Sequence, residues 1–273
     1  MGKKGNKFVA RFVKSASDYA YTEQLTDNDW AWEFLRRNRS YRHDVYAARV
    51  RFHPLVTHVS GVRIYRALGN QSRARHWGLT CYANPDLNAL QTDIFWESEA
   101  LFHSIDARSS VGEPVRSHPD LDLFENRNCI AVLCADNRQK LLFCFKSVLI
   151  DMSLTGPSPL FSPVNLQFRI DGLEDVRKGA KTLLLLYDLT RLRPLRDAKS
   201  ITRRERSYRK RYLIALDCYQ RGGSLQDTAR VFQAFGLTRL KWSVSGNEAL
   251  KKQVWRCRNK GLHLMRGGYR ICH

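Results

Sequence analysis

Residues 247–273 place a helical apolar stripe and a dense row of cations in one short segment. Apolar or small residues recur there at the spacing of one helical face, at Leu250, Val254, Cys257, Gly261 and Leu264. Such a face has to be buried, so this helix must pack against other elements of the chain. Ser245 and Glu248 have the spacing of a capping box and predict where the helix begins.

The opposite face of the same predicted helix carries Lys252, Trp255, Arg256 and Asn259. A folded domain does not require a tryptophan between two cations and an amide, so this face is available to a partner. Residues 266–270 follow as Arg-Gly-Gly-Tyr-Arg, a turn able to take positive φ and then a short basic strand. A helix, a glycine turn and a basic strand are the parts of a winged helix.

The net charge indicates the partner. The chain has 273 residues, a formal net charge of +20 and a pI near 10.0, far more charge than solubility requires. Residues 201–273 contain 17 Lys and Arg against 4 Asp and Glu, so about +13 lies in the last quarter of the chain, which is typical of a nucleic-acid-binding domain. We expect double-stranded DNA as the partner.

The cysteines and the hydropathy pattern indicate a reduced, cytoplasmic protein. Seven cysteines occur without a Cys-x-x-Cys pair, which argues against a structural zinc site. The basic N-terminus lacks the apolar core of a signal peptide, and no run approaches 18 apolar residues. We expect a nucleoid-associated protein that makes no contact with a membrane.

Patterns in the rest of the chain predict an α+β protein. Residues 26–50 predict two helices or one broken helix, with Thr26 and Asp29 as a cap signature and Trp30 and Trp32 as structural residues. Two apolar runs joined by Asp136-Asn137-Arg138 predict a hairpin, residues 163–173 a half-buried strand, and residues 175–192 a helix. Residues 193–211 lack apolar periodicity until Tyr208 and predict a linker. Two further short helices, the second capped by Ser224 and Asp227, precede the last one.

Three domains follow from this division. We expect residues 1–75 to form a basic arm and a helical module, residues 76–195 a small, β-rich α+β scaffold, and residues 196–273 a basic winged-helix DNA-binding domain. The last domain has three helices and resembles a helix-turn-helix unit. The segment 236–245 between its second and third helices is longer than the turn of a simple helix-turn-helix, so an extra turn or a variant unit is expected there.

Two sequence signatures resemble known families. Residues 222–236 and 241–270 resemble the C-terminal DNA-binding domain of unknown-function proteins on proteobacterial integrative and conjugative elements. The similarity lies in Ala229, Phe235, Gly236, Trp242, Arg256 and residues 267–270. Residues 19–44, followed by HWGLTCYANPD, resemble the transcriptional-regulator-like module that accompanies it.

This pair of signatures is similar to activators that switch on excision of such elements by inducing a recombination directionality factor. The resemblance implies a winged-helix transcriptional activator of excision or transfer genes. The resemblance does not indicate which residues of this chain contact bases. Cys257 and the terminal Cys272-His273 depart from the family's pattern, and the latter would shorten the wing strand.

The candidate contact residues therefore come from the helical wheel. We expect base contacts in a major groove from Lys252, Arg256 and Asn259, since Arg can read guanine and Asn can read adenine. We expect phosphate contacts from Lys251, Arg258, Lys260, Arg266, Arg270, Arg209, Lys210 and Arg211. Trp255 can either pack on a neighbouring module or touch sugar or base. Arg36, Arg37, Arg39 and Arg42 form either a solvated face or a partner surface for DNA or polymerase.

Other functions remain open from the sequence. An RNA- or single-strand-binding protein of replication or mobilisation would stack bases on aromatics such as Trp255 and Tyr269. A nuclease or recombinase is a third alternative, although phosphate-cradling and hydrolase motifs are missing. Glu99 and His103 have metal-ligand spacing, with His118, Asp120 and Asp122 nearby, but a complete ligand set is not apparent. We therefore expect no enzyme, metal or cofactor; RNA polymerase and an antiactivator protein are further candidate partners.

Overall fold

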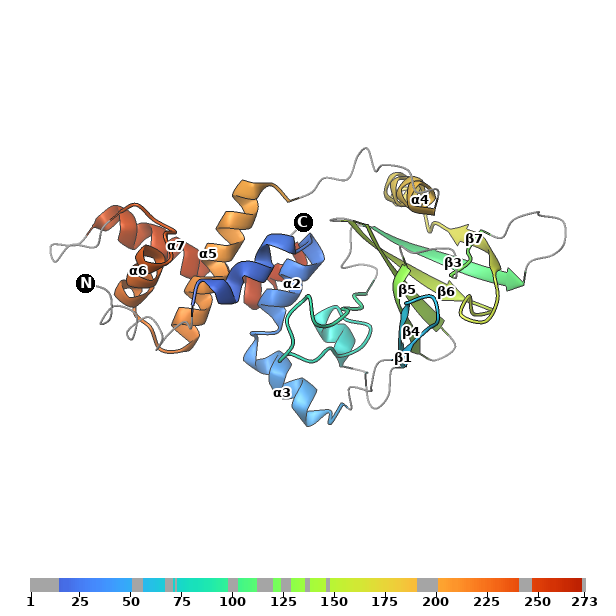
Figure 1. Cartoon of the computed structure of the whole chain (residues 1–273), viewed down its shortest axis with the longest axis horizontal. Coiled ribbons are helices and arrows are strands. Elements are labelled where there is room, and N and C mark those ends of the chain that lie inside the picture. Colours follow the sequence, from blue (N-terminus) through green and yellow to red (C-terminus); the bar gives the residue numbers. More distant parts are fainter. Residues whose placement is uncertain are drawn as a thin grey trace. The chain divides into compact units, whose positions relative to one another are not determined.

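Helices and one large β-sheet make up the part of the chain that the structure, a computed structural model, describes (Figure 1). The described residues are 15–50, 56–66, 71, 73–97, 103–111, 120–123, 129–135, 138–145, 148–190, 201–240 and 247–271. The α+β class predicted from the sequence is confirmed. No helix within these ranges is long and apolar enough to span a bilayer.

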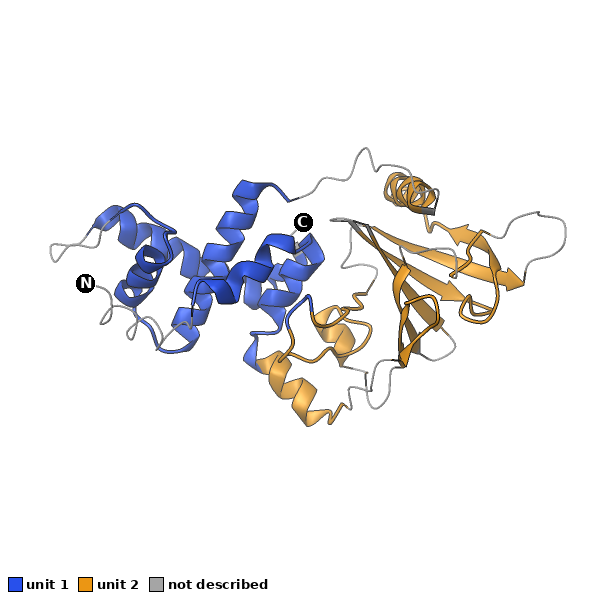
Figure 2. Ribbon diagram, in the orientation of Figure 1, with its two compact units in different colours: residues 1–39, 88–90, 201–272 blue, residues 40–87, 91–200, 273 orange. Residues whose placement is uncertain are grey.

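Contacts divide the chain into two compact units, each built from separate pieces of sequence (Figure 2). Unit 1 consists of residues 1–39, 88–90 and 201–272, and unit 2 of residues 40–87, 91–200 and 273. The first helices of the chain thus share a unit with its basic C-terminal part. The three-part division of the sequence stays a prediction, because a compact unit and a sequence domain are defined differently.

Unit 1 is helical in its described residues. Its elements are η1 (Ser17–Gln24), α2 (Asp27–Leu35), α5 (Arg203–Gln220), α6 (Leu225–Ala234), α7 (Glu248–Met265) and η4 (Gly268–Ile271). Trp30, Trp32 and Phe34 of α2 are fully buried, which confirms the structural role predicted for the two tryptophans. The unit's core therefore contains the aromatic residues of the N-terminal segment.

Capping residues fix the starts of these helices. Thr26 with Asp29 and Ser224 with Asp227 form the predicted capping boxes. The first turn of α7 is capped by Asn247, whose side chain accepts a hydrogen bond from the Leu250 N–H at 3.1 Å. The cap predicted at Ser245 falls outside the described residues.

The predicted linker ends earlier than expected. Helix α5 begins at Arg203, although apolar periodicity begins only at Tyr208. Thr202 and Glu205 form a third capping box, which satisfies backbone donors that would otherwise be unpaired at this helix start. The cations of this stretch are compatible with a helix because Arg204 and Arg211 stack on the Tyr208 ring at 5.8 and 5.7 Å.

The predicted wing strand is wrong. Gly267 has φ +126° and turns the chain, but residues 268–271 then form the short 3-10 helix η4. Tyr269 explains the difference, because its ring is 1% exposed and so belongs to the core of unit 1. A projecting strand would have exposed this side chain, and the described part of unit 1 contains no strand.

Unit 2 contains a seven-stranded sheet with the order β1-β2-β4-β5-β6-β3-β7. The strands are β1 (Val56–Thr57), β2 (Arg63–Arg66), β3 (Ser104–Val111), β4 (Cys129–Ala135), β5 (Arg138–Phe145), β6 (Val148–Thr155) and β7 (Val164–Arg169). Helices α3 (Arg39–Ala47), η2 (Ala74–Trp77) and α4 (Val176–Thr190) complete the described elements outside unit 1. β2 runs parallel to β4 and β3 parallel to β6, and the other pairs are antiparallel.

Local sequence signals for the sheet are confirmed. β4 and β5 form the predicted hairpin, and β7 is the predicted strand, with Val164 buried and Phe168 exposed. The second apolar run of the predicted hairpin is longer than one strand and supplies both β5 and β6. Leu185, Leu186 and Leu189 of α4 join the larger core cluster of the sheet, and Phe95 joins a smaller one.

Helices α5 and α7 approach each other closely at Gly261. A Cβ atom at this position would lie 2.6 Å from the Tyr212 carbonyl oxygen and 3.2 Å from Leu216 Cβ. These neighbours belong to the α5 backbone and to the start of a side chain, so they cannot move without displacing α5. The absence of a side chain at Gly261 therefore sets how α7 packs.

We predict that Gly261→Ala lowers the free energy of unfolding of unit 1 by up to about 2 kcal/mol. Overpacking costs about 1 to 3 kcal/mol and outweighs the roughly 1 kcal/mol that alanine gains in helix propensity. Urea unfolding followed by tryptophan fluorescence measures the change. Lys260→Ala, at the neighbouring exposed position, is the control and should change stability by less than about 0.5 kcal/mol; equal effects of the two variants would contradict the packing argument.

Candidate nucleic-acid interface

Helix α7 buries the predicted apolar face. Leu250, Val254, Cys257, Gly261 and Leu264 are all buried. Burial raises the pKa of the Cys257 thiol to about 11, so this cysteine is a neutral core residue. The side chains half a turn away necessarily lie on the outer face of α7.

That outer face presents a continuous polar stripe, which we call the α7 stripe. It consists of Lys252, Arg256, Asn259, His263 and Arg266, which recur every three or four residues. Asn259 is half-buried and the other four residues are exposed. The stripe extends over about 21 Å, given a rise of about 1.5 Å per residue. No carboxylate is among its members.

His263 and the full length of the stripe were missed by sequence reasoning. The sequence contains the pattern that places His263 on this face, because His263 follows Asn259 by four residues and precedes Arg266 by three. The base-contact candidates Lys252, Arg256 and Asn259 are brought together with Arg266 on this one face. Arg266 was expected only in the turn after the helix, and it lies at the C-cap of α7.

Trp255 lies beside the stripe and is 49% exposed. Its indole is therefore accessible from solvent in unit 1. Tyr208 and Tyr219 of α5 are also partly exposed, and each has a guanidinium group over its ring. Aromatic rings and cations alternate on the described surface of the basic C-terminal part, as they do on surfaces that bind nucleic acids.

A surface pocket lies at the C-terminal end of the stripe. It has a volume of about 350 Å³ and is lined by Asn259, Leu262, His263, Arg266 and Gly268. Gly268 permits this shape, because a Cβ atom there would lie 2.6 Å from both Cδ2 and Nε2 of His263. The two glycines predicted to form a wing turn thus have another role, since Gly267 reverses the chain and Gly268 contacts the imidazole.

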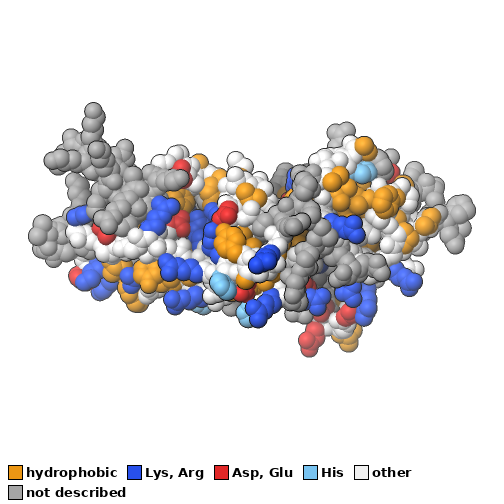
Figure 3. Space-filling model, turned by 90° about the horizontal axis from the view of Figure 1, so that it is seen from below, with side chains coloured by type: hydrophobic (Ala, Val, Ile, Leu, Met, Phe, Trp, Pro, Cys, Tyr) orange, Lys and Arg blue, Asp and Glu red, His pale blue; other side chains and the backbone are white. Residues whose placement is uncertain are grey.

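The phosphate-contact candidates fall into two groups. Lys260, Arg266 and Arg270 are exposed, and Lys251 is exposed but lies 3.7 Å from Glu248. Figure 3 displays one face of the molecule with Lys and Arg side chains in blue, and exposed cations of this kind include Lys260, Arg266 and Arg270. These side chains are positioned to meet a polyanion.

The second group is already engaged inside unit 1. Arg209 forms an ion pair with Asp27 at 2.5 Å, and Lys210 forms one with Glu23 at 3.2 Å. Arg211 and Arg258 lie over the Tyr208 and Tyr219 rings, at 5.7 and 5.5 Å. The acidic residues of the N-terminal segment thus neutralise part of the positive charge of α5.

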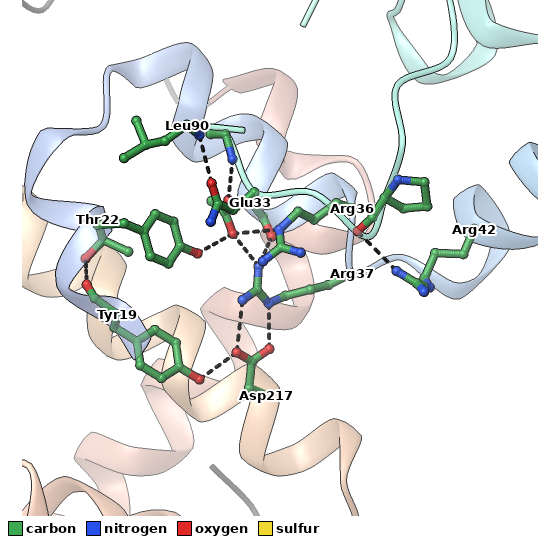
Figure 4. A network of polar contacts seen from close by, with 12 residues as sticks. Tyr19, Thr22, Glu33, Arg36, Arg37, Arg42, Leu90 and Asp217 are labelled. Carbon is green, nitrogen blue, oxygen red and sulfur yellow. Dashed lines mark hydrogen bonds and ion pairs between the residues drawn. The ribbon is translucent and has the colours of Figure 1, made fainter. Parts of the chain in front are cut away.

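The four arginines proposed as a partner surface have different environments. Arg36 and Arg37 form ion pairs with Glu33, and Arg42 forms one with Asp86. Arg37 is 12% exposed and also pairs with Asp217 of α5 (Figure 4). Arg39 is exposed. Arg37 therefore belongs to the interior of unit 1.

A buried polar network joins the N-terminal segment to α5. Arg37 donates to Asp217 at 2.5 and 3.0 Å and to Glu33 Oε2 at 2.6 Å, and Tyr19 donates its hydroxyl to Asp217 at 2.6 Å. Glu33 also accepts from Tyr21 at 2.6 Å and from the Ala89 backbone N–H at 2.9 Å. Burial raises the pKa of Glu33, but the guanidinium groups outweigh this effect and hold that pKa below its usual value.

The same segment reaches the end of α7. Asn38 donates from its side-chain amide to the Met265 carbonyl oxygen at 3.0 Å, next to Arg266 of the stripe. Gln220 of α5 donates to the Arg37 carbonyl oxygen at 2.8 Å. These bonds satisfy backbone acceptors at two helix ends and position α7 relative to α2 and α5.

The described residues contain no group of three or more His, Cys, Asp and Glu side chains that could hold a metal. Two residues of the sequence's candidate set, Glu99 and His118, lie outside the described ranges.

We predict that Arg37→Ala destabilises unit 1 by about 3 kcal/mol, since removing one partner leaves buried carboxylates without compensation. Urea unfolding monitored by tryptophan fluorescence measures the loss. Arg39→Ala removes the same charge from an exposed position two residues away and should cost less than about 0.5 kcal/mol. Similar losses in the two variants would show that the network contributes little.

We also predict a pH dependence from Glu33. Its pKa lies below the usual 4.5 in the folded chain, so its ionised form stabilises the fold, and this stabilisation is lost as the pH falls through the folded pKa. Glu33→Gln should be less stable at pH 7, and its unfolding free energy should fall less between about pH 5 and pH 3. If the unfolding free energies of the wild type and Glu33→Gln changed in parallel with pH, ionised Glu33 would not be the source of the stabilisation.

Comparisons with known proteins agree with the location of this interface. Residues 13–81 match the family described as the proteobacterial transcriptional regulator-like domain. Residues 171–271 match the family described as "T6SS, Transcription factor, DNA binding domain". No curated protein matches the chain. The chain therefore combines a transcriptional regulator-like domain with a DNA-binding domain, and α5, α6 and α7 lie within the latter.

Proposed function

We propose that this chain regulates transcription by binding a specific sequence of double-stranded DNA with the outer face of α7. The observation that carries the proposal is the α7 stripe, an acid-free row of polar side chains within the DNA-binding domain. An α-helix fits the major groove of B-DNA, where base edges present a distinct pattern for each base pair. Helices α5, α6 and α7 form a helical unit that presents α7 in the manner of a helix-turn-helix protein.

The polar side chains of the basic C-terminal part have different roles. Lys252, Arg256 and Asn259 read base edges, with Arg256 suited to guanine and Asn259 to adenine. Lys251, Arg258, Lys260, Arg266 and Arg270 bind phosphates, which orient the domain without selecting a sequence. Arg211 supports them from α5. Arg209 and Lys210 stabilise the attachment of the N-terminal segment, and this use replaces the phosphate contacts expected from the sequence.

The biological role that fits best is activation of excision or transfer genes on a mobile element. This part of the proposal rests on the resemblance of both ends of the chain to activators of integrative and conjugative elements. Arg39 is the exposed member of the four arginines near the end of α2 and is a candidate contact for RNA polymerase or an antiactivator. The protein would act in the cytoplasm, on the nucleoid.

A second candidate function is binding of single-stranded nucleic acid. The exposed rings of Trp255, Tyr208 and Tyr219 favour it, because aromatic faces stack on unpaired bases. The two functions differ in substrate preference. Duplex binding with sequence selection supports the first, and tighter binding to single strands of any sequence supports the second.

The test is selection of bound duplexes from a random library by the full chain at near-physiological salt, followed by sequencing. We expect one enriched motif. Arg256→Ala should then lose about 1 to 3 kcal/mol of discrimination at one base pair, whereas Lys251→Ala should weaken binding to all sequences alike. The full chain is required because unit 1 includes residues of the N-terminal segment.

The control is Arg108→Ala, which removes a charge from an exposed position of β3 in unit 2. It should leave both the motif and the affinity unchanged. If no motif is enriched, or if Arg256→Ala weakens all duplexes equally, base reading by α7 is wrong. Strand cleavage that requires a divalent metal, or a covalent adduct with DNA, would instead indicate a nuclease or recombinase.

A further inference from the structure

The pocket at the end of α7 differs in chemistry from the rest of the stripe. It is lined by Asn259, Leu262, His263, Arg266 and Gly268, three of which have polar side chains. Each of the three polar groups has an N–H donor in every protonation state available to it near neutral pH. None of the lining residues is acidic. The pocket thus suits an anion that accepts several hydrogen bonds.

We propose that this pocket binds one phosphodiester group of the DNA backbone, next to the bases that α7 reads. The inference rests on the proposed function and assigns a ligand to a pocket of the same surface. Arg266 provides the charge and two parallel donors, a geometry that matches phosphate oxygens. His263 provides a donor one helical turn before it on the same face, and Asn259 keeps the base contact proposed above.

The length of the stripe explains why a phosphate is bound at this end. A straight helix of about 21 Å cannot follow the curved major groove along its whole length. Its central residues meet base edges, and its end approaches the sugar-phosphate backbone. The pocket lies at the C-terminal end of the stripe, so a backbone group is what it meets. Its volume of about 350 Å³ accommodates a phosphodiester with part of the attached sugar.

The fold holds the pocket in shape from two sides. Gly268 lies directly against His263, so the imidazole has a backbone surface behind it. Asn38 binds the Met265 carbonyl oxygen at 3.0 Å and fixes the backbone beside Arg266. Arg266 also caps α7, with its backbone N–H donating to the Leu262 carbonyl oxygen at 3.0 Å. Within the described residues, Arg266 forms no ion pair that would compete with a phosphate.

The experiment measures binding of the full chain to one 30-base-pair duplex of arbitrary sequence by fluorescence anisotropy over a range of KCl concentrations. The proteins are the wild type, Arg266→Gln, His263→Ala, the double variant and Arg108→Ala. Losing one bound phosphate should reduce the slope of log K against log salt by about 0.9. We expect this reduction in Arg266→Gln, together with about a tenfold loss of affinity.

Coupling between the two pocket residues separates a shared ligand from general charge loss. If His263 and Arg266 hold the same phosphate, the double variant should lose less affinity than the product of the two single losses. Arg108→Ala should keep the wild-type slope. Far-UV circular dichroism and the unfolding midpoint identify variants that fail to fold. The substitution Arg266→Gln keeps most of the packing of the aliphatic part of the Arg266 side chain.

Three results would overturn the inference. The first is an unchanged slope in Arg266→Gln while Arg256→Ala loses sequence discrimination, which would leave the proposed function standing. The second is stabilisation of the wild type, but not of Arg266→Gln, by inorganic phosphate together with unchanged DNA binding in the variant; the pocket would then take a free anion. The third is the absence of duplex binding by the wild type, which would remove the proposed function as well.

Discussion

The ion pairs of Arg37 with Asp217 and Glu33 are the interaction on which unit 1 depends. The Arg37–Asp217 pair joins residues 180 positions apart in the sequence. Together, the two pairs remove three charges almost completely from water. A charge in such a place has to be paired, because an unpaired one costs several kcal/mol. The network therefore ties α2 to α5, and Asn38 extends the same attachment to the end of α7. This attachment helps to hold the end of α7 against the N-terminal segment.

Local signals in the sequence predicted a large part of the fold. The capping residues Thr26 and Ser224, the spacing of Leu250 to Leu264 and the β4–β5 hairpin each depend on neighbours within a few residues, and all are confirmed. The end of the chain was predicted less well. Tyr269 is 1% exposed, and η4 packs against α2 as well as α7, so η4 replaces a strand in part because of a helix that lies far away in the sequence.

The candidate site divides in the same way. The phase of one helix is enough to place Lys252, Arg256 and Asn259 on a common face, and it could also have included His263. The roles of charged residues are harder to predict, because the partner of each cation is distant in sequence. Arg37 and Arg209 look like surface cations in the sequence, yet Asp217 and Asp27 neutralise them. A count of positive charges thus overestimates the charge available to DNA.

The discontinuity of unit 1 has a consequence for the synthesis of the chain. Residues 17–39 emerge from the ribosome long before α5, α6 and α7, the helices against which they pack. Synthesis proceeds at about 5 to 20 residues per second. For on the order of ten seconds, the helices that bury Trp30, Trp32 and Phe34 have therefore not yet been made. During that interval the nascent chain presents an aromatic segment to chaperones, and the α7 stripe is formed only when the last helix has been made.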